Sequence, residues 1–184
     1  MDAHRGSDGP AGRAVVELRP ARESDLDLLE ALTNDPGTVG EYQWFGWHDP
    51  GYVRRRWQDS GLLTTDGGML VPTLDGRPLG LVSWHRTRTG PHAYCWNIGM
   101  VLLPEARGHG LGAEAQRQLV RYLFAHTQFN RVEASTEVHN RAEQRSLEKA
   151  GFTREGILRG FDFRDGEWRD HVLYSVVRAD LTAD

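Results

Sequence analysis

The spacing of apolar positions predicts alternating strands and helices along the chain. In the first half, strands are expected at residues 15–18, 69–73, 79–85 and 93–103, and helices at 23–33 and 52–58. In the second half, an apolar helical face recurs from Leu111 to Leu123, and further elements are expected as a strand at 131–136, a helix at 140–150 and strands at 152–158 and 168–177. Strands before, between and after the helices are typical of a mixed α/β sandwich.

Turn signals separate these elements. Asp75-Gly76 and Asp165-Gly166 are expected to close hairpins, while residues 34–40 form a turn and residues 87–92 a loop. The strand at 93–103 is apolar or small on both faces, so we place it at the centre of the sheet.

The segment at 102–112, LLPEARGHGLG, carries the most specific chemistry. Gly108, Gly110 and Gly112 allow a tight turn, and they let backbone N–H groups approach a ligand because no Cβ intervenes. The helix that follows begins with unpaired N–H donors and the positive end of its dipole. Together with the charge of Arg107, this arrangement predicts a site for a phosphate or pyrophosphate.

Two common phosphate motifs do not fit this segment well. A nucleotide-hydrolase loop needs a lysine after its second glycine, and Lys149 is the chain's single lysine. Gly108, Gly110 and Ala113 satisfy a loose dinucleotide fingerprint, but that fingerprint normally opens a domain, and here about a hundred residues precede it. A nicotinamide-dependent oxidoreductase built on residues 108–113 stays a remote alternative.

Two motifs in order resemble the Gcn5-related N-acetyltransferase (GNAT) superfamily. Arg107-x-x-Gly110-x-Gly112 resembles its acetyl-CoA pyrophosphate loop. Residues 140–156, NRAEQRSLEKAGFTREG, are similar to the helix and strand that close the cofactor site in the RimJ/RimL-type branch. The resemblance covers about residues 14–178. It implies a mixed, largely antiparallel sheet that is splayed at the cofactor strand and flanked by helices. The length predicts one domain, at 14–184, and the small, polar, glycine-rich residues 1–13 are expected to form a flexible tail.

The same resemblance implies which residues bind acetyl-CoA. The backbone of the strand pairs with the pantetheine arm, and the loop takes the pyrophosphate; the residues are Met100, Val101, Leu102, Arg107, Gly108, His109, Gly110, Leu111 and Gly112. Gly99 would permit a bulge that parts the strand from its neighbour. Asn140 is expected to bond the arm, and its alternative role is that of a plain helix cap.

The resemblance departs from the family's pattern at the proton donor. Many GNAT enzymes carry a tyrosine seven residues after the asparagine, where this chain has Leu147. RimL-type enzymes often carry a serine three residues after it, where this chain has Glu143. Ser146 is a candidate to replace these residues as the proton donor to the thiolate. The alternative is that Ser146 is structural and that water protonates the thiolate.

For the base, Asp162 stands at about the position where RimL-type enzymes carry an acidic residue facing the acceptor. A solvated loop carboxylate is its alternative, Glu41 and His85 rank below it, and His139 is expected to be structural. The acceptor amine is expected against the aromatic segment at 41–48, at Glu41, Tyr42, Trp44, Phe45 and Trp47. Trp84 and Trp96 are expected behind this segment. Plain core packing of these rings is the other interpretation.

Composition and charge argue against several classes of binding partner. A net charge of −4 without a basic run argues against nucleic acid. No apolar run reaches the length of a membrane span, and the first residues lack the apolar core typical of a signal peptide, so we expect a cytoplasmic protein without a membrane partner. Cys95, the single cysteine, is expected in the core. No cluster has metal-ligand spacing, so no metal is expected.

The sequence thus predicts an acetyl-CoA-dependent N-acetyltransferase that uses direct attack by a primary amine. The acceptor is a small molecule or a peptide: a protein N-terminus, an amino sugar, a polyamine or another amine. A homodimer is also considered. The alternative is a non-catalytic acetyl-CoA-binding regulatory module of the same fold, which the missing tyrosine favours.

Overall fold

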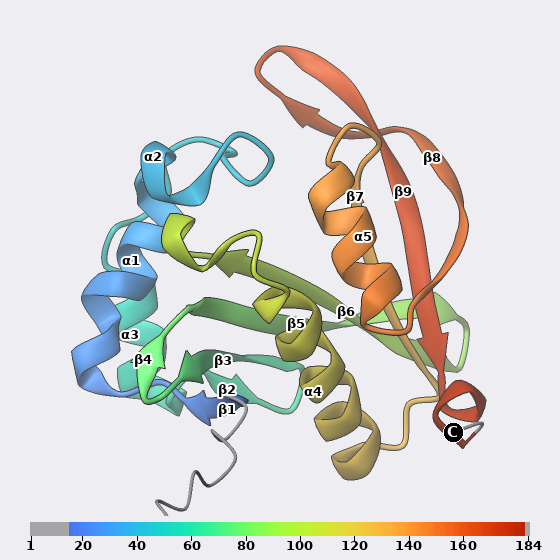
Figure 1. Cartoon of the computed structure of the whole chain (residues 1–184), viewed down its shortest axis with the longest axis horizontal. Coiled ribbons are helices and arrows are strands. Elements are labelled where there is room, and N and C mark those ends of the chain that lie inside the picture. Colours follow the sequence, from blue (N-terminus) through green and yellow to red (C-terminus); the bar gives the residue numbers. More distant parts are fainter. Residues whose placement is uncertain (1–14, 183–184) are drawn as a thin grey trace, which may run out of the picture.

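The computed structural model describes residues 15–182, and the expected tail at 1–13 lies outside them. Its helices are α1 (Leu26–Asn34), α2 (Pro36–Val39), α3 (Tyr52–Ser60), α4 (Leu111–His126) and α5 (Arg141–Lys149), with short 3-10 turns at Glu23–Asp25, Pro104–Ala106 and Arg178–Thr182. Its strands are β1 (Val16–Pro20), β2 (Leu63–Thr64), β3 (Gly67–Leu74), β4 (Arg77–Pro78), β5 (Gly80–Gly90), β6 (Ala93–Leu102), β7 (Arg131–Glu137), β8 (Thr153–Arg164) and β9 (Glu167–Val177). Figure 1 shows how these elements are arranged.

One sheet runs through the molecule in the order β1-β3-β5-β6-β7-β9-β8. Neighbouring strands are antiparallel except β6 and β7, which are parallel. The strand β6 lies in the middle of this order, as its apolar faces predicted. The predicted fold class, a mixed and largely antiparallel sheet flanked by helices, is confirmed.

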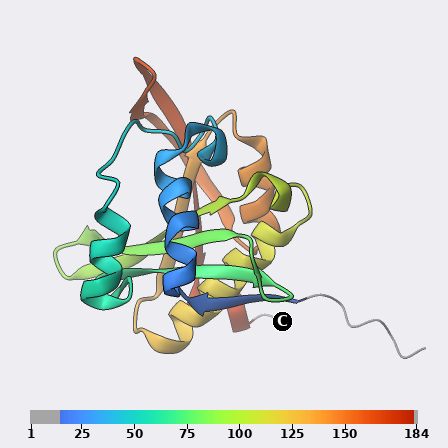
Figure 2. The same cartoon turned by 90° about the vertical axis from the view of Figure 1, so that its left-hand side faces the viewer.

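Helices pack on both faces of the sheet, which gives two apolar layers (Figures 1 and 2). On one side, Leu29 and Leu32 of α1 pack with Val71 and Leu81 of the sheet. On the other side, α4 and α5 cover a larger core that includes Val82, Trp84, Trp96, Leu119 and Leu147. Because side chains alternate along a strand, Leu81 and Val82 enter opposite layers.

The sheet parts between β6 and β7. These strands pair only at Trp96 with Val132 and at Asn97 with Glu133. Beyond this point, β6 stays with β5 up to Leu102, whereas β7 stays with β9 up to Glu137. The expected bulge at Gly99 is wrong, because Gly99 pairs with Ser83 in an unbroken register. The splay arises because each strand follows its other neighbour.

Both predicted hairpin turns are confirmed, and two loops differ from prediction. Asp75-Gly76 and Asp165-Gly166 have left-handed backbones, as two-residue hairpin turns require. Residues 34–40 were expected as a turn, but α2 forms there because Pro36 starts it and Asp35 caps it, accepting from the Thr38 N–H at 3.1 Å. Residues 87–92 were expected as a loop, yet β5 continues to Gly90 against β6.

Within residues 15–182, no helix combines the length and the apolar character needed to cross a membrane.

Candidate functional site

A cavity of about 680 Å³ lies where β6 and β7 part. Its walls come from the loop after α2, the end of β6, the glycine loop, the first turn of α4 and one face of α5. The lining residues are Val39, Gly40, Glu41, Tyr42, Gln43, Met100, Val101, Leu102, Arg107, Gly108, Gly110, Gly112, Ala113, Asn140, Ala142, Glu143, Arg145, Ser146 and Lys149. Most residues expected to bind the cofactor are therefore brought together; His109 and Leu111 belong to the same loop but not to this lining.

The glycine loop has the geometry of an anion cradle. Gly108 and Gly110 have φ of 82° and 78°, a left-handed region that disfavours any side chain. Gly112 lies under the loop, and a Cβ there would come within 2.7 Å of Met100 Cε and 3.2 Å of Ser146 Oγ. The absence of a side chain thus lets the first turn of α4 approach β6 and α5. Since α4 is 16 residues long, its free N–H groups and dipole favour a phosphate at this end.

Arg107 is held by backbone carbonyls. Its Nε donates to Leu102 O at 3.0 Å, and its Nη2 donates to Thr38 O at 2.5 Å and to Val39 O at 3.3 Å. The side chain therefore ties the end of β6 to the last carbonyls of α2. Arg145 and Lys149, which the sequence did not assign to the site, add positive charge to the cavity wall from α5.

Asn140 caps α5. Its side-chain Oδ1 accepts from the Glu143 N–H at 3.2 Å, and the residue is buried while still lining the cavity. The cap that the sequence predicted is confirmed. The contact of Asn140 with a pantetheine arm stays a prediction.

Three side chains form a hydrogen-bonded chain at the cavity wall. Ser146 Oγ donates to Gln116 Oε1 at 2.9 Å, and Gln116 Nε2 donates to Glu143 Oε1 at 2.5 Å. Burial raises the pKa of Glu143 to about 7, although the bond from Gln116 opposes the shift. Sequence reasoning gave Glu143 no role. Its signal was the departure from the serine of the RimL-type pattern.

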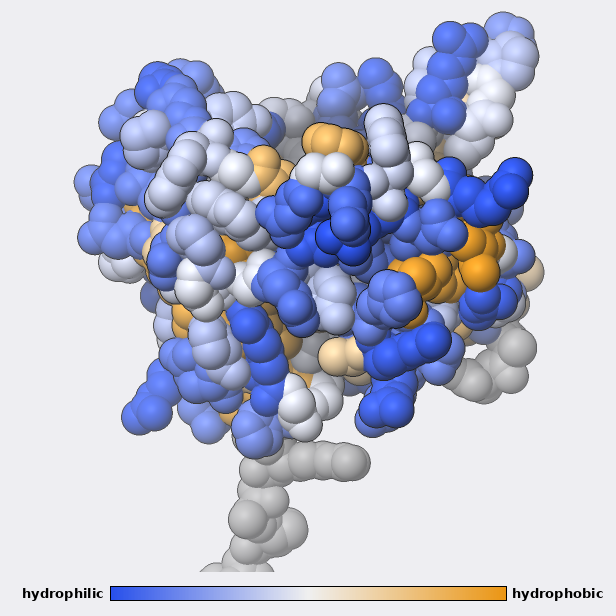
Figure 3. All heavy atoms as spheres, turned by 90° about the horizontal axis from the view of Figure 1, so that it is seen from above, coloured by the Kyte–Doolittle hydropathy of each residue, from blue (hydrophilic) through white to orange (hydrophobic). Residues whose placement is uncertain are grey.

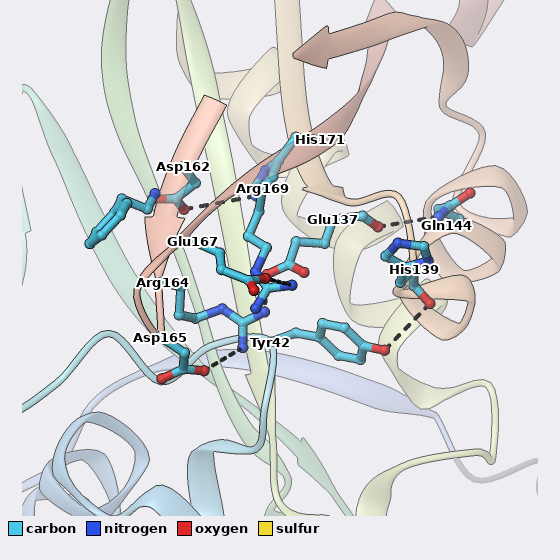
Figure 4. Close-up of polar contacts among 11 residues, drawn as sticks. Tyr42, Glu137, His139, Gln144, Asp162, Arg164, Asp165, Glu167, Arg169 and His171 are labelled. Carbon is cyan, nitrogen blue, oxygen red and sulfur yellow. Dashed lines mark hydrogen bonds and ion pairs between the residues drawn. The ribbon is translucent and has the colours of Figure 1, made fainter. Parts of the chain in front are cut away.

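Tyr42 connects the opposite end of the cavity to a buried ion pair (Figure 4). Its hydroxyl donates to His139 O at 3.4 Å, and Arg164 Cζ lies 5.7 Å from the centre of its ring. Arg164 and Glu137, 7% and 5% exposed, form a buried ion pair next to this ring. Burial is the main cause that raises the pKa of Tyr42, so the phenol is neutral at physiological pH.

Asp162 lies on β8 beside this cluster and outside the cavity lining (Figure 4). Its Oδ1 accepts from the Phe163 N–H at 2.9 Å, and its Oδ2 lies 3.8 Å from His171 Nε2. Burial lowers the pKa of His171, and the nearby Asp162 charge opposes this. Phe161 and Phe163 are exposed, so they alternate with the half-buried Asp162 as expected. His171 is buried on β9, only nine residues after Asp162, but the register shift between Leu158 and Asp162 decides which residues of the two strands face each other, so no local pattern indicated it.

The aromatic residues separate into two groups, and neither lines the cavity apart from Tyr42. The rings of Trp44 and Trp47 pack edge to face, with their centres 5.0 Å apart. Phe45 and Trp47 are exposed, and 79% of Trp47 is accessible to solvent. Trp84 and Trp96 were expected behind the wall of the acceptor pocket, but they do not lie there. They lie on the sheet face that α4 covers, where Trp84 packs on Tyr122 and Trp96 donates to Thr127 Oγ1 at 2.9 Å. Both are buried in the core beneath α4, and neither lines the cavity.

The lower-ranked candidates also separate. Glu41 lines the cavity beside Tyr42, whereas His85 is exposed on β5 and lines a smaller cavity elsewhere. Cys95 is fully buried, as expected. Across residues 15–182, no three His, Cys, Asp or Glu side chains gather in a way that could hold a metal ion.

From above, the surface is mainly polar, and its apolar side chains form small separate patches (Figure 3). This face offers a ligand charged and hydrogen-bonding groups more than one continuous apolar surface.

Comparison with known proteins agrees with this geometry. The model of the Acetyltransferase (GNAT) domain family matches residues 16–153, and the chain belongs to this family. The probable N-acetyltransferase YjcK of Bacillus subtilis is 35% identical over 106 residues, 58% of each chain. The ribosomal protein uS5-alanine N-acetyltransferase of Escherichia coli is 29% identical over 104 residues, 56% of this chain and 53% of that protein. The chain therefore matches little more than half the length of these relatives.

Solved structures share the fold over nearly the whole chain. Mycobacterium smegmatis RimJ in complex with CoA-disulfide has a TM-score of 0.75 at 24% identity, covering 91% of this chain and 84% of that one. The spermidine N-acetyltransferase of Vibrio cholerae in complex with CoA and spermine has a TM-score of 0.74 at 16% identity, covering 91% and 98%. Both neighbours were solved with CoA or a CoA derivative bound, and at these identities the likeness shows the shared fold. The ribosomal-protein N-acetyltransferase among the sequence relatives agrees with the RimJ/RimL-type resemblance.

Proposed function

We propose that this chain is an acetyl-CoA-dependent N-acetyltransferase that transfers an acetyl group to a primary amine by direct attack. The cavity between the parted strands carries the proposal, because it joins an anion cradle at one end to titratable side chains at the other. The open edge of β6 beyond Asn97 offers unpaired backbone groups to an extended arm, as in strand addition. The cradle of Gly108, Gly110 and Gly112 fits a pyrophosphate.

The reaction needs a neutral amine, a nearby thioester and a way to protonate the leaving thiolate. Asp162, with His171 behind it, is our candidate to receive the proton of the amine. The acceptor would enter past Tyr42 and Glu41. Relatives are named for acting on a ribosomal-protein alanine, and a structural neighbour is named for spermidine. A peptide with a free N-terminus, a polyamine, an amino sugar and an amino acid are therefore the acceptor classes to compare.

Turnover decides between this proposal and a non-catalytic acetyl-CoA-binding module. The module is favoured by Leu147, a fully buried residue where many relatives carry a tyrosine. An amine panel with detection of free CoA thiol should show release that depends on both amine and enzyme, with the product identified by mass. Tight acetyl-CoA binding without release for every class of amine would favour the module.

The cradle makes a first prediction. Gly110→Ala places a side chain at φ 78°, which costs about 1–2 kcal/mol and reshapes the loop. A lost charge-assisted bond to phosphate adds about 1.5–3 kcal/mol, so the Kd for acetyl-CoA should rise about tenfold or more. Calorimetry checks this. Gly76→Ala is the matched control, since Gly76 has φ 77° in a distant hairpin turn. Equal Kd values for the wild type and the folded Gly110→Ala protein would contradict the cradle.

Direct attack makes a second prediction, on Cys95. Burial raises the pKa of its thiol to about 12, so the nucleophilic thiolate is not formed at neutral pH. Cys95→Ala should keep most of the activity, and the wild type mixed with acetyl-CoA alone should gain no stable acetyl group. Intact-protein mass spectrometry measures this. An acetyl group located on Cys95 would show a covalent intermediate instead.

A further inference from the structure

One face of α5 forms a wall along the cavity. Asn140, Glu143 and Ser146 follow at helical spacing on this face, and all three line the cavity. At its C-terminal end, Lys149 O accepts from Arg117 of α4 at 2.5 Å, so this end lies beside the first helix turns after the glycine loop. At the other end, Tyr42 contacts His139. A rise of 1.5 Å per residue places Glu143 about 9 Å from Lys149, toward the Tyr42 end.

Glu143 lines the cavity, and one of its two carboxyl oxygens is engaged in a hydrogen bond. Oε1 accepts from Gln116, while no hydrogen bond to Oε2 is found among residues 15–182. Gln116 is itself fixed: it is buried, and its Oε1 accepts from Ser146. This arrangement suits a neutral carboxyl, which can accept at Oε1 and donate from Oε2. The Ser146 proton already points at Gln116, so the hydroxyl is committed away from the cavity.

Building on the proposed acetyl transfer, we propose that neutral Glu143 is the proton donor to the sulfur of the departing CoA, with Gln116 and Ser146 as the residues that position it. The role that the sequence suggested for Ser146 thereby passes to Glu143. Ser146 acts through Gln116 and touches no reacting atom.

The step balances in atoms and charge. The amine nitrogen bonds to the thioester carbonyl carbon, and the carbon–sulfur bond breaks with its electron pair on sulfur. The Oε2 proton of Glu143 passes to that sulfur, which gives the free thiol. The surplus proton of the amine leaves through the base or water, and the Glu143 carboxylate regains a proton from solvent.

The acidity of Glu143 suits this transfer. Burial raises its pKa to about 7, while an ordinary thiol has a pKa of about 8.5, so the proton moves downhill to a thiolate. Around it, β6 contributes only Met100, Val101 and Leu102, and α4 contributes the neutral Gln116. The charged or titratable groups on the other walls are Glu41, Tyr42, Arg107, Arg145 and Lys149.

Glu143→Gln tests the proposal, because glutamine keeps the acceptor for Gln116 but holds no acidic proton. In the wild type, kcat/KM should show a falling limb above about pH 7, where Glu143 ionises. The variant should lack that limb. At about pH 6, kcat/KM of the variant should be about tenfold lower than that of the wild type. This effect is smaller than the general range for acid–base groups, because thiolates are weak bases. Above about pH 8, the two values of kcat/KM should converge. The affinity of the variant for acetyl-CoA should stay within about twofold.

Further variants separate donation from structure. Glu148→Gln is the matched control: it lies on the same helix, bonds Tyr174 and does not line the cavity, so its pH profile should equal that of the wild type. Gln116→Leu should move the falling limb to higher pH, because the bond from Gln116 lowers the pKa of Glu143. Glu143→Ser is measured in parallel, so that the result does not depend on the folding of one variant.

A second readout is independent of turnover. Difference infrared spectroscopy should show a protonated-carboxyl band that disappears with a midpoint near pH 7 and is absent from Glu143→Gln. Absence of that band in the wild type overturns the proposal. An active wild type whose pH profile is shared by Glu143→Gln and Glu143→Ser overturns it too, and leaves the acetyltransferase function standing. No transfer to any amine overturns that function, and this inference with it.

Discussion

Arg164→Ala is expected to lose about 3–5 kcal/mol of unfolding free energy, the loss measured when one partner of a buried ion pair is removed. Glu137 would be left as a buried carboxylate without its cation. For a chain of this size, the melting temperature should fall by roughly 6–20 °C. Arg164 also lies against the ring of Tyr42. Relative to the wild type, the variant should therefore lose more affinity for the acceptor than for acetyl-CoA.

Denaturant unfolding of three variants checks this cause. Adding Glu137→Leu to Arg164→Ala should restore most of the loss, because an uncharged pair needs no partner. Arg159→Ala, an exposed arginine on the same strand, should change stability by no more than about 0.5 kcal/mol. An Arg164→Ala protein as stable as Arg159→Ala would show that the pair contributes nothing.

The ion pair also shows why part of the site could not be predicted. Arg164 and Glu137 lie 27 positions apart and meet because β7 and β8 both pair with β9. The register of β8 on β9 shifts twice, between Arg154 and Gly156 and between Leu158 and Asp162. No local pattern encodes those shifts, so the faces of β8 depend on long-range pairing.

The glycine loop was predictable for the opposite reason. Its geometry depends on a local backbone: left-handed glycines follow a strand and come directly before a helix, all within one short segment. Asn140 is similar, because a cap needs only the residues that follow it. The aromatic segment at 41–48 lacked a helical or strand period, and the structure gives it neither element; only Tyr42 of its rings reaches the cavity.

Glu143 lies between these cases. Its place on a helix face follows from local spacing, but its raised pKa depends on burial against α4 and on Gln116, which is 27 residues away. The sequence could therefore show that the residue differs from the family's serine, and only the packing of α4 on α5 gives that difference a chemical meaning.

Asp162→Asn is expected to lower kcat/KM by about 10²-fold, the low end for a general base, while acetyl-CoA affinity is preserved. If Asp162 receives the proton of the amine, the loss should shrink at high pH, where the free amine is already neutral. Orientation of a cationic acceptor alone predicts a raised KM with little rescue by pH. Initial rates over saturating and limiting amine, from about pH 6 to about pH 10, separate the two roles.

His171 reports whether the substitution did what it should. The charge of Asp162 raises the pKa of this buried histidine, so removing that charge should lower the pKa further in an NMR titration. Asp165→Asn is the matched control, because Asp165 lies in the nearby turn at φ 52°, a backbone that asparagine also adopts. Asp165 itself pairs with Arg164, so a second control is Asp75→Asn in the distant turn at φ 50°, which should keep wild-type kinetics. If Asp162→Asn lowers the pKa of His171 and yet keeps wild-type kinetics at every pH, Asp162 is a solvated strand carboxylate. Glu41, which lines the cavity beside Tyr42, is then the next base to test.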